Sequence, residues 1–156
     1  MTVLRRLAHG ACAVAAWAAS GGAGAGQPPP AGAGRVWQQI QVVAPEADAM
    51  AVRLDVVLVR DVAWMARLPV TAPQWFAARQ ALQQSAGKGL QVISLDVPPM
   101  AATKALQLPA QASRAAGAFV YADRASGPEV PAAPLAPHRC VKVTLTRDGL
   151  TQAACP

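Results

Sequence analysis

Apolar residues recur at every second position between residues 52 and 58. Arg53 and Asp55 interrupt the other face, and Arg60 follows the apolar positions. A period of two residues is typical of a β-strand with one face in the core and the other in water. We therefore predict a half-buried strand here, with Asp55 on a solvated face. The apolar positions are Val52, Leu54, Val56 and Leu58.

Shorter stretches along the chain have the same strand-like pattern. Pro98 and Pro99 end one of them, and a proline-rich loop spans residues 128–137. Asp148 and Gly149 are typical of the tight turn of a closing hairpin. Six or seven short strands separated by turns indicate a mainly β fold, a β-sandwich. The further predicted strands are residues 36–43, 90–97, 105–108, 116–122, 140–146 and 150–155.

Residues 71–86 change to a helical period and predict one inserted helix of about 12 residues. Thr71 and Gln74 have the spacing of a capping box, in which the Thr71 hydroxyl accepts a hydrogen bond from the Gln74 amide. Gly87 or Gly89 supplies the end of the helix. The residues that share one helical face are Trp75, Ala78, Arg79 and Leu82.

The N-terminal part has the order of an export signal. Residues 1–26 begin with a short basic segment, continue with a small apolar stretch and end in Gly and Ala, which is typical of a secretory signal peptide. Residues 27–35 are rich in Gly and Pro and predict a flexible linker. The β-sandwich domain then occupies residues 36–156. Cys12 is either a lipidation site or an incidental small residue of the leader, because His9 stands where lipoprotein processing prefers an aliphatic residue.

The net charge of +6 does not indicate nucleic-acid binding. Without Arg5 and Arg6 of the leader, 12 basic side chains remain against 8 acidic ones. They are scattered singly, with no run of Lys and Arg that could follow a phosphate backbone. The pattern predicts a mildly basic, solvated surface.

Few residues have the types and spacings that chemistry requires. The mature chain has one histidine, His138, with no nearby cysteine or carboxylate pattern for a metal site. Asp55 and Asp61 flank a strand without a second carboxylate at functional spacing, so solvated or salt-bridged aspartates are favoured over catalytic ones. We predict no catalytic, metal or cofactor site. An alternative hypothesis is a periplasmic β-sandwich that binds a small molecule or glycan in a concave pocket.

Cys140 and Cys155 are the cysteines that remain after leader removal. If residues 148–149 form the turn, Lys142 lies opposite Cys155, and Cys140 lies on the same face one diagonal away. That diagonal is about 7–8 Å and needs a bulge before a disulfide can close. The alternatives are a disulfide, which an oxidising periplasm permits, or two separate thiols at a sheet edge.

Aromatic residues gather around the start of the helix, at Trp64, Trp75 and Phe76. Burial between the helix and a sheet is the first interpretation. A partner-binding hot spot is the alternative, because exposed Trp is a common interface anchor.

The ordered set of elements resembles the type VI secretion lipoprotein family TssJ, also called VasD or Lip. The resemblance covers residues 36–154, and the chain is similar to a divergent member, since Asp55, Val56 and Val57 stand where the family motif V-R-I-Y-Q-L has Tyr-Gln-Leu. The segments that carry it are VWQQIQVVA, AVRLDVVLVRD, WFAARQAL, VPPM and GAFVYAD.

This resemblance implies a transthyretin-like β-sandwich in the periplasm, associated with the outer membrane through an N-terminal lipid. It implies docking to the periplasmic domain of the inner-membrane anchor protein TssM, through the loop between the first two strands, and no enzymatic activity. The implied partner-binding residues of that loop are Pro45, Glu46, Asp48 and Met50.

Overall fold

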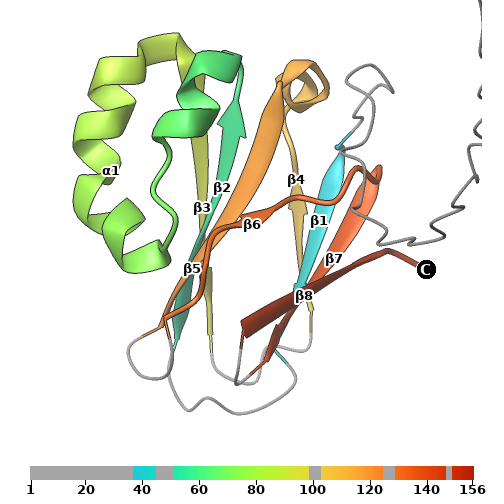
Figure 1. The fold of residues 1–156 in the computed structure, drawn as a ribbon. Helices are drawn as coiled ribbons and strands as arrows, with labels where there is room; N and C mark the ends of the chain where they lie inside the picture. The colour runs from blue at the N-terminus through green and yellow to red at the C-terminus, as the bar shows by residue number, and fades with distance from the viewer. Residues whose placement is uncertain (1–36, 45–50, 99–102, 125–128, 147–148) are drawn as a thin grey trace, which may run out of the picture. The chain divides into compact units, whose positions relative to one another are not determined.

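A computed structural model describes residues 37–44, 51–98, 103–124, 129–146 and 149–156. Two four-stranded sheets face each other in a sandwich, and one α-helix covers the outer side of one sheet (Figure 1). The predicted mainly β sandwich with one inserted helix is confirmed. The strands are β1 (Gln39–Val43), β2 (Val52–Val59), β3 (Leu90–Val97), β4 (Lys104–Gln107), β5 (Gly117–Arg124), β6 (Ala133–Pro134), β7 (Cys140–Thr146) and β8 (Gly149–Ala154).

The strand order is β4-β1-β7-β8 in one sheet and β3-β2-β5-β6 in the other. All neighbours are antiparallel except β1 and β7, which run parallel. The sequence pattern predicted the long strands to within about two residues, a normal uncertainty at element ends. It missed β6, because two residues inside a proline-rich loop carry no period.

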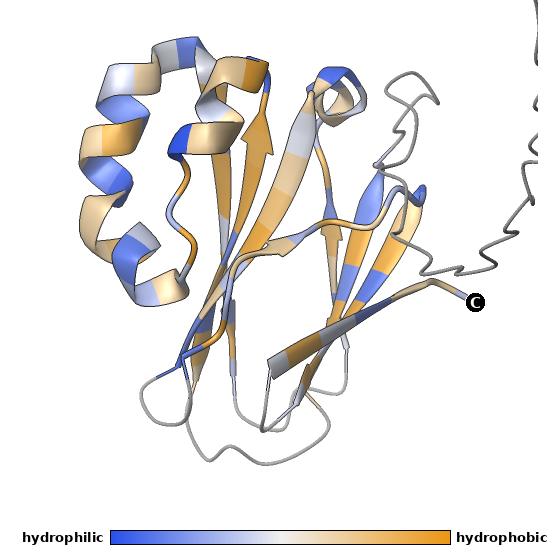
Figure 2. Ribbon diagram, in the orientation of Figure 1, coloured by the Kyte–Doolittle hydropathy of each residue, from blue (hydrophilic) through white to orange (hydrophobic). Residues whose placement is uncertain are grey.

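Apolar side chains of both sheets fill the space between them, and Figure 2 shows apolar positions along β2, β3 and β7. Alternation places Leu54 and Val56 of β2 in this interior, as predicted, opposite Ile40 and Val42 of β1. The members of this core that are fully enclosed are Ile40, Val42, Leu54, Val56, Ala112, Val120, Val141 and Val143.

The outer face of β2 differs from the prediction of a solvated face. Asp55, Val57 and Val59 are all fully buried there, because α1 lies across this side of the sheet. A second apolar cluster joins Val57 and Val59 to Trp75 of the helix and Tyr121 of β5. The strand therefore contributes to two cores. On its outer face, only Arg53 is exposed to solvent.

The helix α1 (Ala72–Ala86) has 15 residues, which is longer than predicted. Its C-terminal cap is Gly87, whose φ of 51° lies in the left-handed region that glycine tolerates best. Thr71 is the N-cap, but the predicted capping box is wrong, since its buried hydroxyl makes no hydrogen bond. The Thr71 backbone instead forms a β-bridge to Pro131.

Three short 3-10 helices connect the larger elements. They are η1 (Val62–Arg67), η2 (Gly87–Gly89) and η3 (Ala110–Arg114). Trp64 of η1 packs closely against Gly89 of η2. A Cβ added to Gly89 would lie only 3.1 Å from the Trp64 ring. Glycine at that position thus permits the close approach.

A disulfide joins Cys140 and Cys155, whose Cα atoms lie 5.4 Å apart. The predicted register of the closing hairpin is wrong by two residues. Thr146 pairs with Gly149 and Lys142 with Ala153, which brings the two cysteines directly opposite each other. No bulge is needed, since the Cys155 amide donates to the Cys140 carbonyl at 3.1 Å, as in a regular hydrogen-bonded pair.

Several predicted features lie outside the described residues. They are the signal peptide, the linker, Cys12, and the loop residues Pro45, Glu46, Asp48 and Met50. Within the described part of the chain, no helix has the length and apolar character needed to cross a bilayer.

Removing the disulfide should lower stability. In the chain-entropy model, a cross-link closing a loop of 15 residues contributes about 3 kcal/mol. We expect the Cys140→Ala, Cys155→Ala double variant to lose roughly this much in urea unfolding under oxidising conditions. Reductant should shift the unfolding midpoint of the original chain by a similar amount and leave that of the double variant unchanged. Equal midpoints for the two proteins without reductant would contradict a stabilising bond.

Candidate functional site

Loops distant in sequence originate from one end of the sandwich. In β-sheet register, Val52 pairs with Val97 and with Arg124, and Val42 pairs with Lys104. The strand ends that flank residues 45–50, 99–102 and 125–128 therefore lie together. The turn between β7 and β8 joins the same end, because β7 runs parallel to β1. We call this region the loop end.

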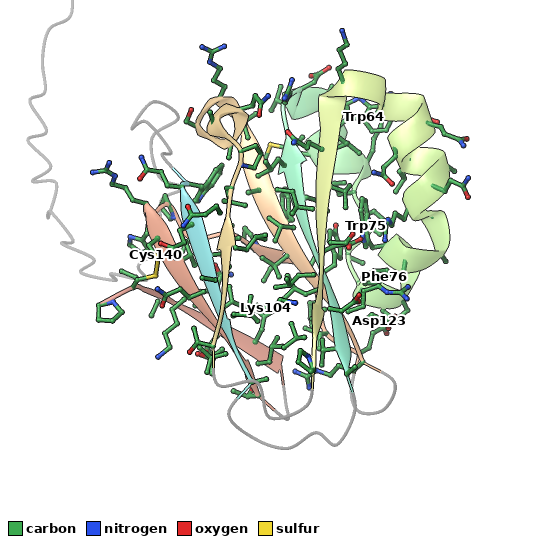
Figure 3. All side chains as sticks on the ribbon, turned by 180° about the vertical axis from the view of Figure 1, so that it is seen from behind. Trp64, Trp75, Phe76, Lys104, Asp123 and Cys140 are labelled. Carbon is green, nitrogen blue, oxygen red and sulfur yellow. A yellow bond between two sulfur atoms is a disulfide. The ribbon has the colours of Figure 1, made fainter. Side chains whose placement is uncertain are left out.

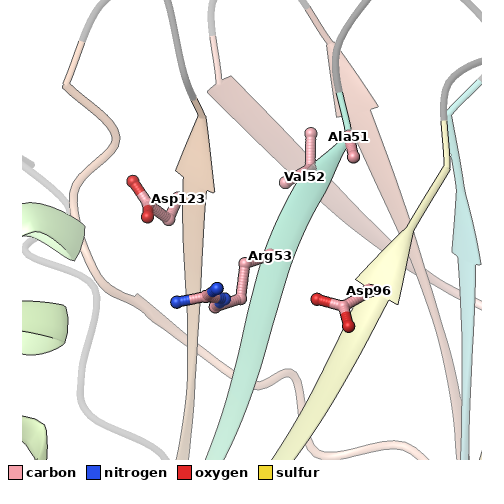
Figure 4. A pocket seen from close by; sticks show the side chains of 5 residues that line it. All are labelled: Ala51, Val52, Arg53, Asp96 and Asp123. Atoms are coloured by element: carbon pink, nitrogen blue, oxygen red, sulfur yellow. The ribbon is translucent and has the colours of Figure 1, made fainter.

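The loop end carries a small open depression of about 260 Å³. Its centre is Arg53 of β2, which pairs in register with Asp96 of β3 on one side and Asp123 of β5 on the other (Figure 4). Ala51 and Val52 complete the lining. One cation thus stands between two carboxylates, three residues after the predicted partner loop in the sequence.

The Arg53 side chain extends toward the helix. Its guanidinium carbon lies 5.9 Å from the centre of the Phe76 ring, within range of a cation–π interaction. Within the described part of the chain, the only ion pair closer than 4.0 Å is formed elsewhere, between Arg79 and Asp55. Asp96 and Asp123 therefore retain carboxylate oxygens that can accept hydrogen bonds from a partner.

Two residues further along β2, Asp55 occupies the same outer face but is completely buried. Its Oδ2 accepts from the Trp75 indole Nε1 at 2.9 Å, and its Oδ1 accepts from the Ser94 hydroxyl at 2.7 Å. The Arg79 guanidinium lies 3.4 Å from Oδ2. A buried carboxylate is stable only with such partners, so this cluster fastens α1 to the sheet.

An aromatic stack adjoins the carboxylate. The rings of Trp75 and Tyr121 lie 4.8 Å apart at an interplanar angle of 15°. The Tyr121 hydroxyl donates to the Pro69 carbonyl at 2.8 Å, and burial raises its pKa from 10.0 to about 12. Phe76 directly follows Trp75, so fixing Trp75 also places Phe76 near Arg53. Figure 3 shows both aromatic residues on the sheet side of the helix.

The sequence-predicted aromatic residues divide between burial and partial exposure. Trp75 is fully buried between helix and sheet, as the first interpretation expected. Trp64 and Phe76 are half-buried and pack against the same cluster. The structure does not place the three side chains together as one exposed hot spot.

The residues considered for catalysis are not brought together. Asp55 is enclosed by its three partners, and Asp61 caps η1 by accepting from the Ala63 amide at 2.9 Å. His138 is exposed beside the first residue of β7, on the other sheet. In the described ranges, no group of three or more His, Cys, Asp or Glu is placed to hold a metal ion. Apolar side chains also fill the space between the sheets, which weighs against a ligand pocket there.

Comparison with solved structures identifies two similar proteins. Serratia marcescens Lip, a membrane-bound component of the type VI secretion system, is 14% identical with a TM-score of 0.51, covering 78% of this chain and all of Lip. The type VI secretion lipoprotein TssJ1 from Pseudomonas aeruginosa is 13% identical with a TM-score of 0.53, covering 76% and 97%. No family model and no curated protein matches the sequence. The chain therefore has the fold of the TssJ/Lip lipoproteins, although little of the sequence is shared.

Truncating Asp55 should destabilise the domain strongly. Asp55→Ala leaves the Trp75 indole N–H without its acceptor and Arg79 without its counter-ion. We expect a loss of about 3 kcal/mol, the lower end for a broken buried pair, because 33% of the Arg79 side chain remains exposed. Urea unfolding followed by tryptophan fluorescence measures it. The matched control is Asp61→Ala, which removes an exposed cap and should cost at most about 1 kcal/mol. Equal losses in both variants would contradict the anchoring role.

Tyr121 should make stability depend on alkaline pH. It is the single tyrosine of the chain, and its folded pKa of about 12 exceeds the ordinary value of 10.0. The neutral phenol is thus favoured by folding, and this contribution is complete below pH 10 and is lost as pH rises toward 12. The loss should reach about 1 kcal/mol near pH 11. Tyr121→Phe should lack this dependence in denaturation curves measured across that range. Parallel curves for the two proteins would show that burial does not shift the phenol.

Proposed function

We propose that this chain is an exported envelope protein that works as a docking component of a type VI secretion membrane complex. Its partner is the periplasmic domain of an inner-membrane anchor protein, similar to TssM. The observation that carries the proposal is the fold shared with Lip and TssJ1, both components of that system. The chain acts by binding and not by catalysis. Asp55, one of the carboxylates considered for catalysis, is buried and holds the helix on the sheet.

Export and anchoring complete the proposal. Residues 1–26 act as the signal peptide, residues 27–35 as a tether, and residues 36–156 as the periplasmic domain. The Cys140–Cys155 disulfide is suited to an oxidising compartment. A lipid on Cys12 would associate the domain with the outer membrane, and mass spectrometry of the mature N-terminus tests this directly.

The loop end is the proposed docking surface. Pro45, Glu46, Asp48 and Met50 belong to the loop that precedes Ala51, a lining residue of the Arg53 depression. The charges of Arg53, Asp96 and Asp123 offer a partner one donor between two acceptors. Such alternating charge fixes the orientation of a partner more than it adds affinity.

Capture of the partner should depend on the loop end. Arg53→Glu places three acidic residues side by side, so we expect at least about a ten-fold loss of capture of the anchor protein from solubilised envelopes. The matched control, Arg114→Glu, makes the same charge change at an exposed position of η3 and should leave capture unchanged. Circular dichroism establishes that both variants fold. If the original chain recovers no secretion component, the proposed function is wrong; if both variants capture equally, the docking surface is misplaced.

A further inference from the structure

The end of the sandwich opposite the loop end is rich in cations. The Arg60 amide donates to the Gly89 carbonyl next to Lys88, and the Ala116 amide donates to the Val59 carbonyl just after η3. Arg139 precedes the first residue of β7, and its backbone carbonyl accepts a hydrogen bond from the Gln38 amide. We call this region the basic end. Its exposed cations are Arg60, Arg67, Lys88, Arg114 and Arg139.

None of these cations forms an ion pair with another described residue. Across the described residues, the single ion pair is that of Arg79 with Asp55, below the helix. Arg67 instead lies 5.1 Å over the Trp64 ring, and Arg60 donates to the Gln91 side chain at 3.3 Å. The exposed acid at this end is Asp61, whose carboxylate already caps η1. The five positive charges thus face one negative charge.

The opposite end has a different balance. Arg53, Lys104 and Arg124 lie near the loop end with the carboxylates Asp96 and Asp123. Basic and acidic groups alternate there across neighbouring strands. The excess of positive charge in the described part of the domain is therefore located at the basic end, where it creates a positive local potential.

The chain enters the sandwich at this same end. Trp37 is buried, and its indole donates to the Ala136 carbonyl at 2.8 Å, which fixes where β1 begins. The Gln38 carbonyl accepts from the Leu108 amide, between the end of β4 and η3. The segment that we propose as a tether joins the domain directly before Trp37, so the attachment point of the tether lies at the basic end.

We propose that the basic end binds the anionic headgroups of a phospholipid membrane. Cations spread over η1, η2, η3 and the start of β7 form a broad surface, which suits a layer of separate headgroups. Each cation near an anionic surface strengthens association by roughly five-fold. This inference rests on the export and tethering of the proposed function and adds a second, electrostatic contact to the tether.

The test measures sedimentation of the exported chain with lipid vesicles. Vesicles are made of phosphatidylcholine alone or of equal parts phosphatidylcholine and phosphatidylglycerol. We expect stronger binding to the anionic vesicles than to phosphatidylcholine alone. High salt should remove this difference, because salt screens exposed charges beyond a Debye length of about 10 Å at moderate ionic strength. The triple variant Arg60→Gln, Arg114→Gln, Arg139→Gln should bind on the order of 100-fold more weakly.

The matched control removes three cations elsewhere. Arg53→Gln, Lys104→Gln, Lys142→Gln has the same net charge and the same N-terminus as the basic-end variant, so any contribution of the leader or a lipid cancels. It should keep binding within about three-fold of the original chain. Equal weakening of both triple variants would overturn the proposal, and so would equal binding of the original chain to the two kinds of vesicle.

Two further outcomes separate this proposal from its alternatives. Strong binding to poly-glutamate but not to anionic vesicles would assign the basic end to an acidic protein and overturn the membrane contact. Because the vesicle assay contains no secretion protein, failure there leaves capture of the anchor protein untouched. Failure of capture with intact vesicle binding would instead reject the docking function alone.

Discussion

The carboxylate of Asp55 is the contact on which the arrangement of the domain depends. A buried charge is tolerated only when it has hydrogen-bond partners and an opposite charge close by. Trp75 and Ser94 donate the hydrogen bonds to Asp55, and Arg79 supplies the opposite charge. Two of the three partners come from α1. The helix is therefore held at a defined position on the sheet, in addition to the apolar packing of Trp75, Phe76 and Leu82 in the second cluster. The polar contact adds directional bonds to this non-directional packing.

This contact also connects the helix to the loop end. Fixing Trp75 fixes Phe76, which lies against Arg53, and Arg53 is the centre of the depression between Asp96 and Asp123. A sheet with a helix fixed on its outer face holds Arg53, Asp96 and Asp123 in a constant geometry, and a stable scaffold is the usual support for binding residues. The helix would thus support the proposed docking surface without being the proposed point of contact.

Alternation along the chain predicted most of the sandwich, because long strands with one face in a shared core leave a period of two. It could not reveal the second core, since Asp55 resembles a solvated residue until α1 is placed over it. Val57 and Val59, on the same face, were the available signal of a covered surface. The hairpin register failed for another reason: Asp148 and Gly149 are strong turn residues, yet Gly149 belongs to β8. The residues of the depression come from three strands, and only tertiary pairing brings them together.

The two ends of the sandwich can act independently because the strands separate them. An eight-residue strand such as β2 spans roughly 26 Å, whereas electrostatic influence in water decays over about 8 Å at physiological salt. Positive charge at the basic end therefore has little effect on a partner at the loop end. Since the chain enters at the basic end, attraction to an anionic surface there would direct the loop end away from that surface. In the proposed docking function, the loop end would then remain accessible to the anchor protein.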